Sequence, residues 1–158
     1  MDKSAVKKYA VWARRELISR VAQKAMKYGI SGDNIDSADA GSRGGTVLSD
    51  KEKRQRKALV EQIKRKGYEQ VMEEVAYTWF NRFMALRFME VNGYLPSKVR
   101  VFTDENNEFK PQILAEAIHM DLDGLDMNKV YELKDTNQQD ELYKYLLIVQ
   151  CTALNSVL

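Results

Sequence analysis

The side chains best suited to binding chemistry are basic and cluster between residues 51 and 66, KEKRQRKALVEQIKRK. Lysine and arginine repeated along a helix contact the phosphates of duplex DNA, with an affinity that falls steeply as salt rises. We therefore predict a DNA-binding face on this segment. Its candidate residues are Lys51, Lys53, Arg54, Arg56, Lys57, Lys64, Arg65 and Lys66.

Two features of this basic segment shape the prediction. No aromatic residue interleaves with its cations, so stacking of single-stranded bases is not suggested there. The alternative is a solvated face, or one that docks on the nearby acids Glu69, Glu73 and Glu74. Both interpretations remain open from the sequence.

A second group of polar residues lies within the aromatic-rich stretch 75–96, VAYTWFNRFMALRFMEVNGYLP. Arg87 and Glu90 are three residues apart and can meet on one face of a helix. Buried charges persist only when they are paired, because an unpaired one costs several kcal/mol (about 3–5). We predict a structural ion pair that orients neighbouring helices. The open alternative is that a polar cluster of Asn81, Arg82, Arg87 and Glu90 contacts a ligand or partner.

No catalytic residue and no metal site is predicted. Asp121, Asp123 and Glu132 occupy the first, third and twelfth positions of an EF-hand loop. Leu125, however, stands where a ligand is needed, and Asp126 stands where the turn requires glycine.

Other patterns of catalytic or ligand-binding chemistry are equally incomplete. The segment GSRGG at 41–45 lacks the spacing of a phosphate-binding loop. His119 is the chain's one histidine, so no Ser-His-Asp or Cys-His set can be assembled.

Helices must position these side chains, because only Pro96 and Pro111 interrupt a sequence rich in helix formers. We predict a mostly α fold, a single domain of about five to six helices, with at most a short strand or hairpin near 98–110. Residues 30–48 are expected to form a flexible loop because they are rich in Gly, Ser and Asp. The expected helices span about 2–28, 50–66, 68–92, 111–119, 126–133 and 138–158, with Val99 to Thr103 extended.

The stretch 75–96 is expected to form the central helix of a core. Its apolar residues sweep more than half of the helical circumference at 100° per residue, which is typical of a helix packed on several sides. These residues are Val75, Tyr77, Trp79, Phe80, Phe83, Met84, Leu86, Phe88 and Val91.

The composition suits one globular domain in a reducing cytoplasm. The 158 residues are 44% hydrophobic and 30% charged, with one cysteine and no apolar run long enough to cross a membrane. Residues 1–66 hold 17 basic against 8 acidic residues (a net +9), and residues 67–158 hold 8 against 15 (a net −7). Such asymmetry predicts a basic surface at one end of the chain and an acidic one at the other.

The motifs TWFNR (78–82), ALRFME (85–90) and NGYLP (92–96) closely resemble the N-terminal region of the PglX family. Members of that family are adenine-specific DNA methyltransferases of BREX phage-defence systems. The opening KKYAVWARREL and the closing ELYKYLLIVQCTALNSVL fit the same region in order. The last helix stops with its apolar pattern unfinished, which also suggests part of a longer protein.

The resemblance implies a non-catalytic, N-terminal helical accessory domain at 1–158. The parent enzyme would use S-adenosylmethionine, but the fragment itself lacks the glycine-rich loop and the Asn/Asp-Pro-Pro-aromatic motif of such enzymes. Implied partners are double-stranded DNA, the rest of the methyltransferase chain and other defence-system proteins, without a membrane. The alternative function is a protein–protein interaction module that docks on the catalytic part without contacting DNA.

Overall fold

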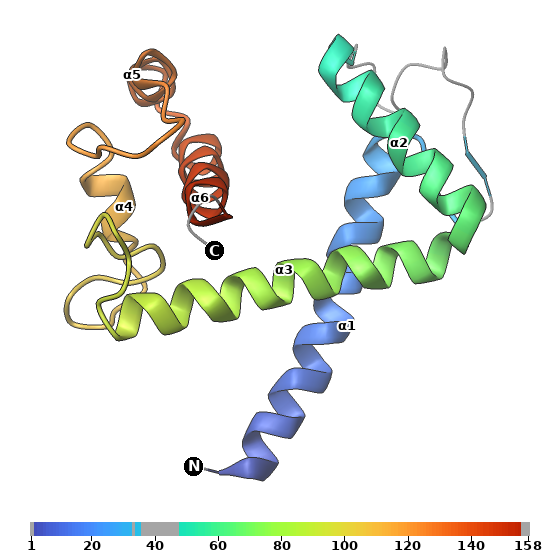
Figure 1. Cartoon of the computed structure of the whole chain (residues 1–158), viewed down its shortest axis with the longest axis horizontal. Coiled ribbons are helices and arrows are strands. Elements are labelled where there is room, and N and C mark those ends of the chain that lie inside the picture. The colour runs from blue at the N-terminus through green and yellow to red at the C-terminus, as the bar shows by residue number, and fades with distance from the viewer. Residues whose placement is uncertain (1, 33, 36–47, 156–158) are drawn as a thin grey trace. The chain divides into compact units, whose positions relative to one another are not determined.

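The computed structural model describes residues 2–32, 34–35 and 48–155, and these are mostly helical (Figure 1). This confirms the predicted mostly α fold with about five to six helices. The described part contains an isolated antiparallel bridge between Ile30 and Ile35 and no sheet. The helices are α1 (Lys3–Lys27), α2 (Asp50–Lys66), α3 (Tyr68–Val91), α4 (Gln112–Ala115), α5 (Met127–Asp135) and α6 (Gln139–Asn155).

Local signals explain where these helices begin and end. Ser49 caps α2 by accepting a hydrogen bond from the Glu52 N–H, and the Glu52 carboxylate accepts one from the Ser49 N–H in return. Asp126 caps α5 in a similar way, through the N–H groups of Asn128 and Lys129. Gly67, at a φ of 92°, provides the break between α2 and α3 that other residues adopt only with strain.

The chain divides into two compact units, Met1–Asn81 and Arg82–Leu158, and α3 runs through the boundary between them. The first unit contains α1, α2 and the first part of α3. Its core is small and draws on all three helices and on the turn after α1. The buried residues are Ala25, Ile30, Ile63, Val71 and Met72.

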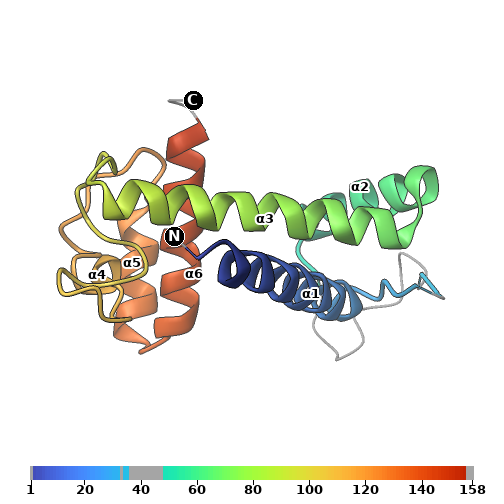
Figure 2. The ribbon, with the colours of Figure 1, turned by 90° about the horizontal axis from the view of Figure 1, so that it is seen from below.

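The second unit has the larger core. In it α6 packs against both α4 and α5 (Figure 2). The last turns of α3 and the segment 95–103 complete it. Its buried residues are Leu86, Leu95, Val101, Ile113, Ala117, Met120, Val130, Leu142, Leu146, Cys151 and Leu154.

Three local expectations need correction or cannot be judged. The predicted helix at 111–119 is only one turn, α4, and Glu116 to His119 continue as a turn. The apolar arc of the central helix is not covered throughout, because Tyr77, Phe88 and Val91 are more than half exposed. The loop predicted at 30–48 lies mostly outside the described residues, as does the GSRGG segment.

Candidate nucleic-acid interface

The candidate DNA-binding residues all lie on α2, and seven of the eight are exposed. The exception is Arg56, which is half-buried. Its Nε donates a hydrogen bond of 2.7 Å to the backbone carbonyl of Tyr28, the residue that ends α1. A cation at a helix C-terminus satisfies an otherwise unpaired carbonyl and complements the helix dipole. Arg56 therefore fastens α2 to α1 and does not belong to the open face.

Lys66 and Lys53 also have partners within the first unit. The Lys66 Nζ donates to the Glu74 carboxylate at 2.7 Å, across the turn from α2 to α3. This hydrogen bond lowers the pKa of Glu74, with help from the Gln70 amide and against partial desolvation. Lys53 lies 3.5 Å from the carboxylate of Asp50, one turn earlier in α2. At the C-terminal end of the segment, Lys66 therefore contacts one of the nearby acids, as the alternative interpretation expected.

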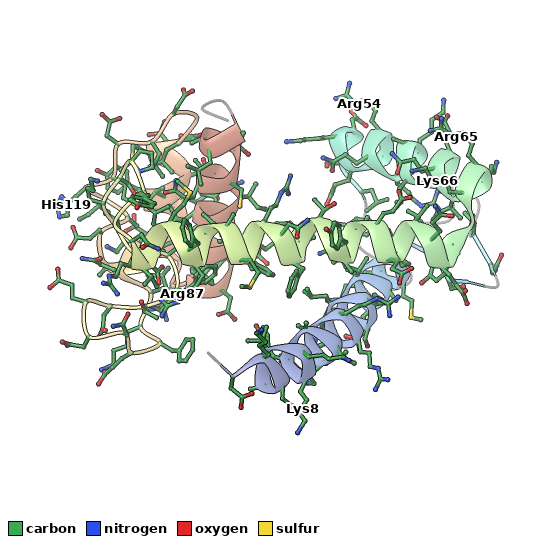
Figure 3. The ribbon with its side chains drawn as sticks, turned by 60° about the horizontal axis from the view of Figure 1, so that its bottom comes forward. Lys8, Arg54, Arg65, Lys66, Arg87 and His119 are labelled. Carbon is green, nitrogen blue, oxygen red and sulfur yellow. The ribbon has the colours of Figure 1, made fainter. Side chains whose placement is uncertain are left out.

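The remaining cations form an open basic face. No side-chain ion pair to a described residue is present for Lys51, Arg54, Lys57, Lys64 or Arg65. On a helical wheel they lie on the side opposite the buried Ile63, with the exposed acid Glu61 among them. Residues 51 to 65 extend about 21 Å along the helix axis, at 1.5 Å per residue. Figure 3 shows Arg54 and Arg65 pointing away from α3.

The predicted polar cluster is only partly assembled. Arg87 Nη1 forms an ion pair with Glu90 Oε1 and donates a hydrogen bond of 3.0 Å to the hydroxyl of Thr103. Asn81 is exposed and belongs to the first unit. Arg82 is half-buried, and its charge partly opposes the burial that raises the pKa of the Cys151 thiol.

Glu90 is the centre of this arrangement, and its side chain has no exposed surface. Its Oε2 accepts hydrogen bonds from the backbone N–H groups of Val101 at 2.6 Å and Phe102 at 2.7 Å. Its Oε1 accepts one from the Thr103 hydroxyl at 2.8 Å. Burial raises the pKa of Glu90, but these donors and Arg87 together outweigh it, so the pKa lies below its ordinary value.

The sequence did not reveal these partners of Glu90. The alternation of Val99, Val101 and Thr103 indicated an extended segment. Its backbone N–H groups donate to the Glu90 carboxylate, however, and not to a neighbouring strand. Tyr143 on α6 adds to the same site by donating its hydroxyl to the Val101 carbonyl at 3.2 Å. Burial, and then the charge of Glu90, raise the pKa of that phenol. These hydrogen bonds join Glu90 of α3 and Tyr143 of α6 to residues 101–103, so their role is to hold this segment in place.

A groove of about 690 Å³ lies within the first unit, between α1 and α3. Ala10 and Arg14 line it from α1, and Arg14 forms an ion pair there with Glu73 of α3. The other lining residues are Glu69, Gln70, Glu74, Ala76, Tyr77 and Phe80. With three carboxylates to one arginine, the groove is unsuited to phosphate, in contrast to the open face of α2.

The described part of the chain offers no site for a metal ion and no membrane-spanning helix. No group of three or more His, Cys, Asp and Glu side chains is arranged there to bind a metal ion. His119 is exposed at the surface of the second unit (Figure 3). Among the helices described, none is long and apolar enough to cross a membrane.

Comparison with known proteins identifies relatives of the whole chain. No family model and no solved structure matches it. The adenine-specific methyltransferase PglX of Lacticaseibacillus casei (strain Zhang) is 36% identical over 100% of this chain, which covers 15% of that protein. The adenine-specific methyltransferase BrxX of Escherichia coli O9:H4 (strain HS) is 35% identical over 98% of this chain, which covers 14% of that protein. The chain is therefore homologous, along its length, to a segment of the adenine-specific methyltransferases PglX and BrxX, as the resemblance in its sequence predicted.

Proposed function

We propose that this chain is the non-catalytic N-terminal domain of an adenine-specific (N6) DNA methyltransferase that serves a BREX-type phage-defence system in the cytoplasm. The match to about one seventh of PglX and BrxX supports this role. The two prolines, Pro96 and Pro111, are far apart, so the chain lacks the paired-proline motif that grips a flipped adenine. Methyl transfer from S-adenosylmethionine would then belong to another part of the parent protein.

The open basic face of α2 is the observation that carries the DNA-binding part of the proposal. Lys51, Arg54 and Lys57 lie on successive turns and are exposed, without intramolecular ion pairs to described residues. Cations spaced in this way neutralise phosphates and release counterions, which supplies affinity without reading the sequence. The domain would hold duplex DNA while the catalytic part selects the target adenine.

The test uses the full-length methyltransferase with Lys51, Arg54 and Lys57 changed to alanine. We expect the KM for duplex DNA to rise at least tenfold while kcat at saturating DNA stays within twofold, because the variant removes only bonds to the DNA backbone. A control with Lys110, Lys134 and Lys144 changed to alanine removes the same charge from the second unit. An unchanged KM in the α2 variant, or an equal rise in the control, would contradict a specific role for this face.

A second candidate function rests on an apolar patch of the second unit. Met84, Phe88, Val91 and Tyr94 are each about half exposed or more, and the rings of Phe88 and Tyr94 lie 5.9 Å apart. Exposed apolar patches mark interaction sites. Since the relatives are about seven times longer, the occupant would be the catalytic part of the same chain.

Hydroxyl-radical footprinting checks this interaction by comparing the 158-residue chain with the full-length enzyme. We expect modification of Met84 and Phe88 to be at least threefold slower in the full-length enzyme. Phe109, which is 91% exposed and lies outside the patch, serves as the internal control. Equal rates for Met84 and Phe88 in the two proteins would rule this docking out.

A further inference from the structure

The N-terminal half of α1 carries an exposed pair of aromatic rings. The ring centroids of Tyr9 and Trp12 lie 5.7 Å apart with an interplanar angle of 39°. Tyr9 is 53% exposed and Trp12 is 59% exposed. Neither residue belongs to either core, so packing within the chain does not explain this pair.

Trp12 faces away from the rest of the first unit, whereas Tyr9 lies between Trp12 and the buried Ala13 on the helical wheel. Ala10 and Arg14 define the side of α1 that meets α3, because both line the groove between the two helices. At 100° per residue, Trp12 lies about 160° around the helix from each of them. Figure 3 shows the neighbouring Lys8 also pointing away from α3.

Cations outnumber acids around these rings. Glu16 lies one turn after Trp12, and its carboxylate forms an ion pair with Arg20. Residues 3–15 contain five cations and no acid, and of these cations Arg14 is paired with Glu73. Lys8 lies one turn before Trp12 and Arg15 one turn after it, so both flank the ring on one side of the helix. Neither Lys8 nor Arg15 has a side-chain ion pair with a described residue.

We infer that this stripe, Lys8, Tyr9, Trp12 and Arg15, binds single-stranded nucleic acid. A base stacks on the exposed ring of Trp12 or Tyr9, while adjacent phosphates meet the two cations. Exposed aromatics interleaved with lysine and arginine are the physical requirement for this mode of binding, because every base has a flat face to stack. Paired bases in a duplex present only their edges, so a duplex cannot use the rings.

Two observations narrow the interpretation. One argues against an anionic membrane as the ligand, and the other distinguishes this site from the basic face of α2. The exposed apolar residues Val6, Val11 and Trp12 point in widely different directions around α1, so they offer no continuous face to an anionic membrane. Lys8 and Arg54 point away from α3 in opposite directions (Figure 3). The stripe on α1 is therefore a site distinct from the open face of α2, and it does not depend on the role proposed for α2.

Trp12 itself reports the binding. A Trp79→Phe variant leaves Trp12 as the one tryptophan. We expect a single-stranded 12-mer of deoxyadenosine to quench its fluorescence at about 50 mM salt. In the otherwise unchanged chain, Trp12→Ala should weaken binding of the labelled 12-mer about 5- to 100-fold, as measured by anisotropy. The salt slope should stay the same, because every cation that meets a phosphate is still present, whereas Lys8→Ala should lower it by about 0.7.

Controls distinguish stacking from plain charge. Phe109→Ala removes an exposed ring elsewhere and should leave 12-mer binding unchanged. Trp12→Ala should leave duplex binding unchanged. Changing Lys51, Arg54 and Lys57 to alanine should leave the quenching of Trp12 unchanged. The proposals for α1 and α2 can therefore be contradicted independently of each other. The inference is overturned if the 12-mer does not quench Trp12, or if Trp12→Ala binds it normally. Equal quenching by polyphosphate, poly-glutamate or anionic phosphatidylserine vesicles would also overturn it.

Discussion

The hydroxyl of Thr103 donates a hydrogen bond of 2.8 Å to Oε1 of Glu90, joining a loop to the last turn of α3. Both residues are buried. The same carboxylate receives two backbone N–H groups of the loop, so it serves as the hydrogen-bonding partner that a second strand would otherwise supply. This relationship explains why a charged residue sits in the core of the second unit without any catalytic partner.

Replacing Glu90 tests that role. Glu90→Gln keeps the shape of the side chain but removes its charge. It also replaces one acceptor oxygen by an NH2 group, which cannot accept hydrogen bonds from the donors around it. We expect the free energy of unfolding to fall by about 3 kcal/mol, the range for breaking a buried, hydrogen-bonded charge. Urea unfolding followed by helical circular dichroism measures it. A loss below about 1 kcal/mol would show that Glu90 does not hold segment 100–103.

The pH dependence of stability follows from the same carboxylate. Because the folded-state pKa of Glu90 lies below its ordinary value of 4.5, its ionised form stabilises the fold fully above 4.5. That contribution is lost as the pH falls from 4.5 through the lower folded-state value. We therefore expect the difference in stability between the unchanged chain and Glu90→Gln to be constant above about pH 6 and to shrink below about 4.5. A difference that grew on acidification would contradict the sign of this pKa shift.

Much of the helical layout could be predicted, because helix ends depend on residues close in sequence. Ser49, Asp126 and Gly67 each act within four residues of themselves. The partners of Glu90 could not be predicted, since they depend on how the chain folds back after Gly93. The exposure of Phe88 was not predicted either. A helical wheel gives the direction of a side chain but does not show whether another element packs against it.

The candidate DNA-binding face was also predicted only in part. Composition was enough to predict a basic helix, yet it could not tell which cations have partners within the chain. Arg56 meets Tyr28 across 28 residues of sequence, and Lys66 meets Glu74 across a turn. The open face therefore consists of fewer cations than the eight in the segment.

Arg54 and Arg56 form a matched pair for separating binding from stability. Arg56→Ala removes the half-buried hydrogen bond to the Tyr28 carbonyl and should lower the free energy of unfolding by about 1–2 kcal/mol. Arg54→Ala removes an exposed cation and should change stability by less than about 0.5 kcal/mol while weakening duplex binding. Thermal unfolding and duplex titration of both variants make the comparison. Equal stability losses in the two variants would contradict the structural contact of Arg56.

Gln150 offers a test of a buried polar group. It is fully buried, and its Nε2 has no hydrogen-bond partner among the described residues, while its Oε1 accepts a 3.4 Å hydrogen bond from Ser97. An unsatisfied buried amide is unfavourable, so the similarly shaped Gln150→Met should leave the free energy of unfolding unchanged or raise it by about 1 kcal/mol. Chemical denaturation of the variant checks this. A loss above about 1 kcal/mol would show that the amide is satisfied.

The salt dependence of duplex binding tests the central claim most directly. The logarithm of the binding constant of this chain for a duplex of arbitrary sequence should fall linearly with the logarithm of salt concentration. Changing Lys51, Arg54 and Lys57 to alanine should make the slope shallower by about 2–3, at roughly 0.9 for each phosphate that is no longer neutralised. The control at Lys110, Lys134 and Lys144 should keep the original slope. No binding at about 20 mM salt, or the same slope in the α2 variant, would contradict the claim that this face of α2 holds DNA.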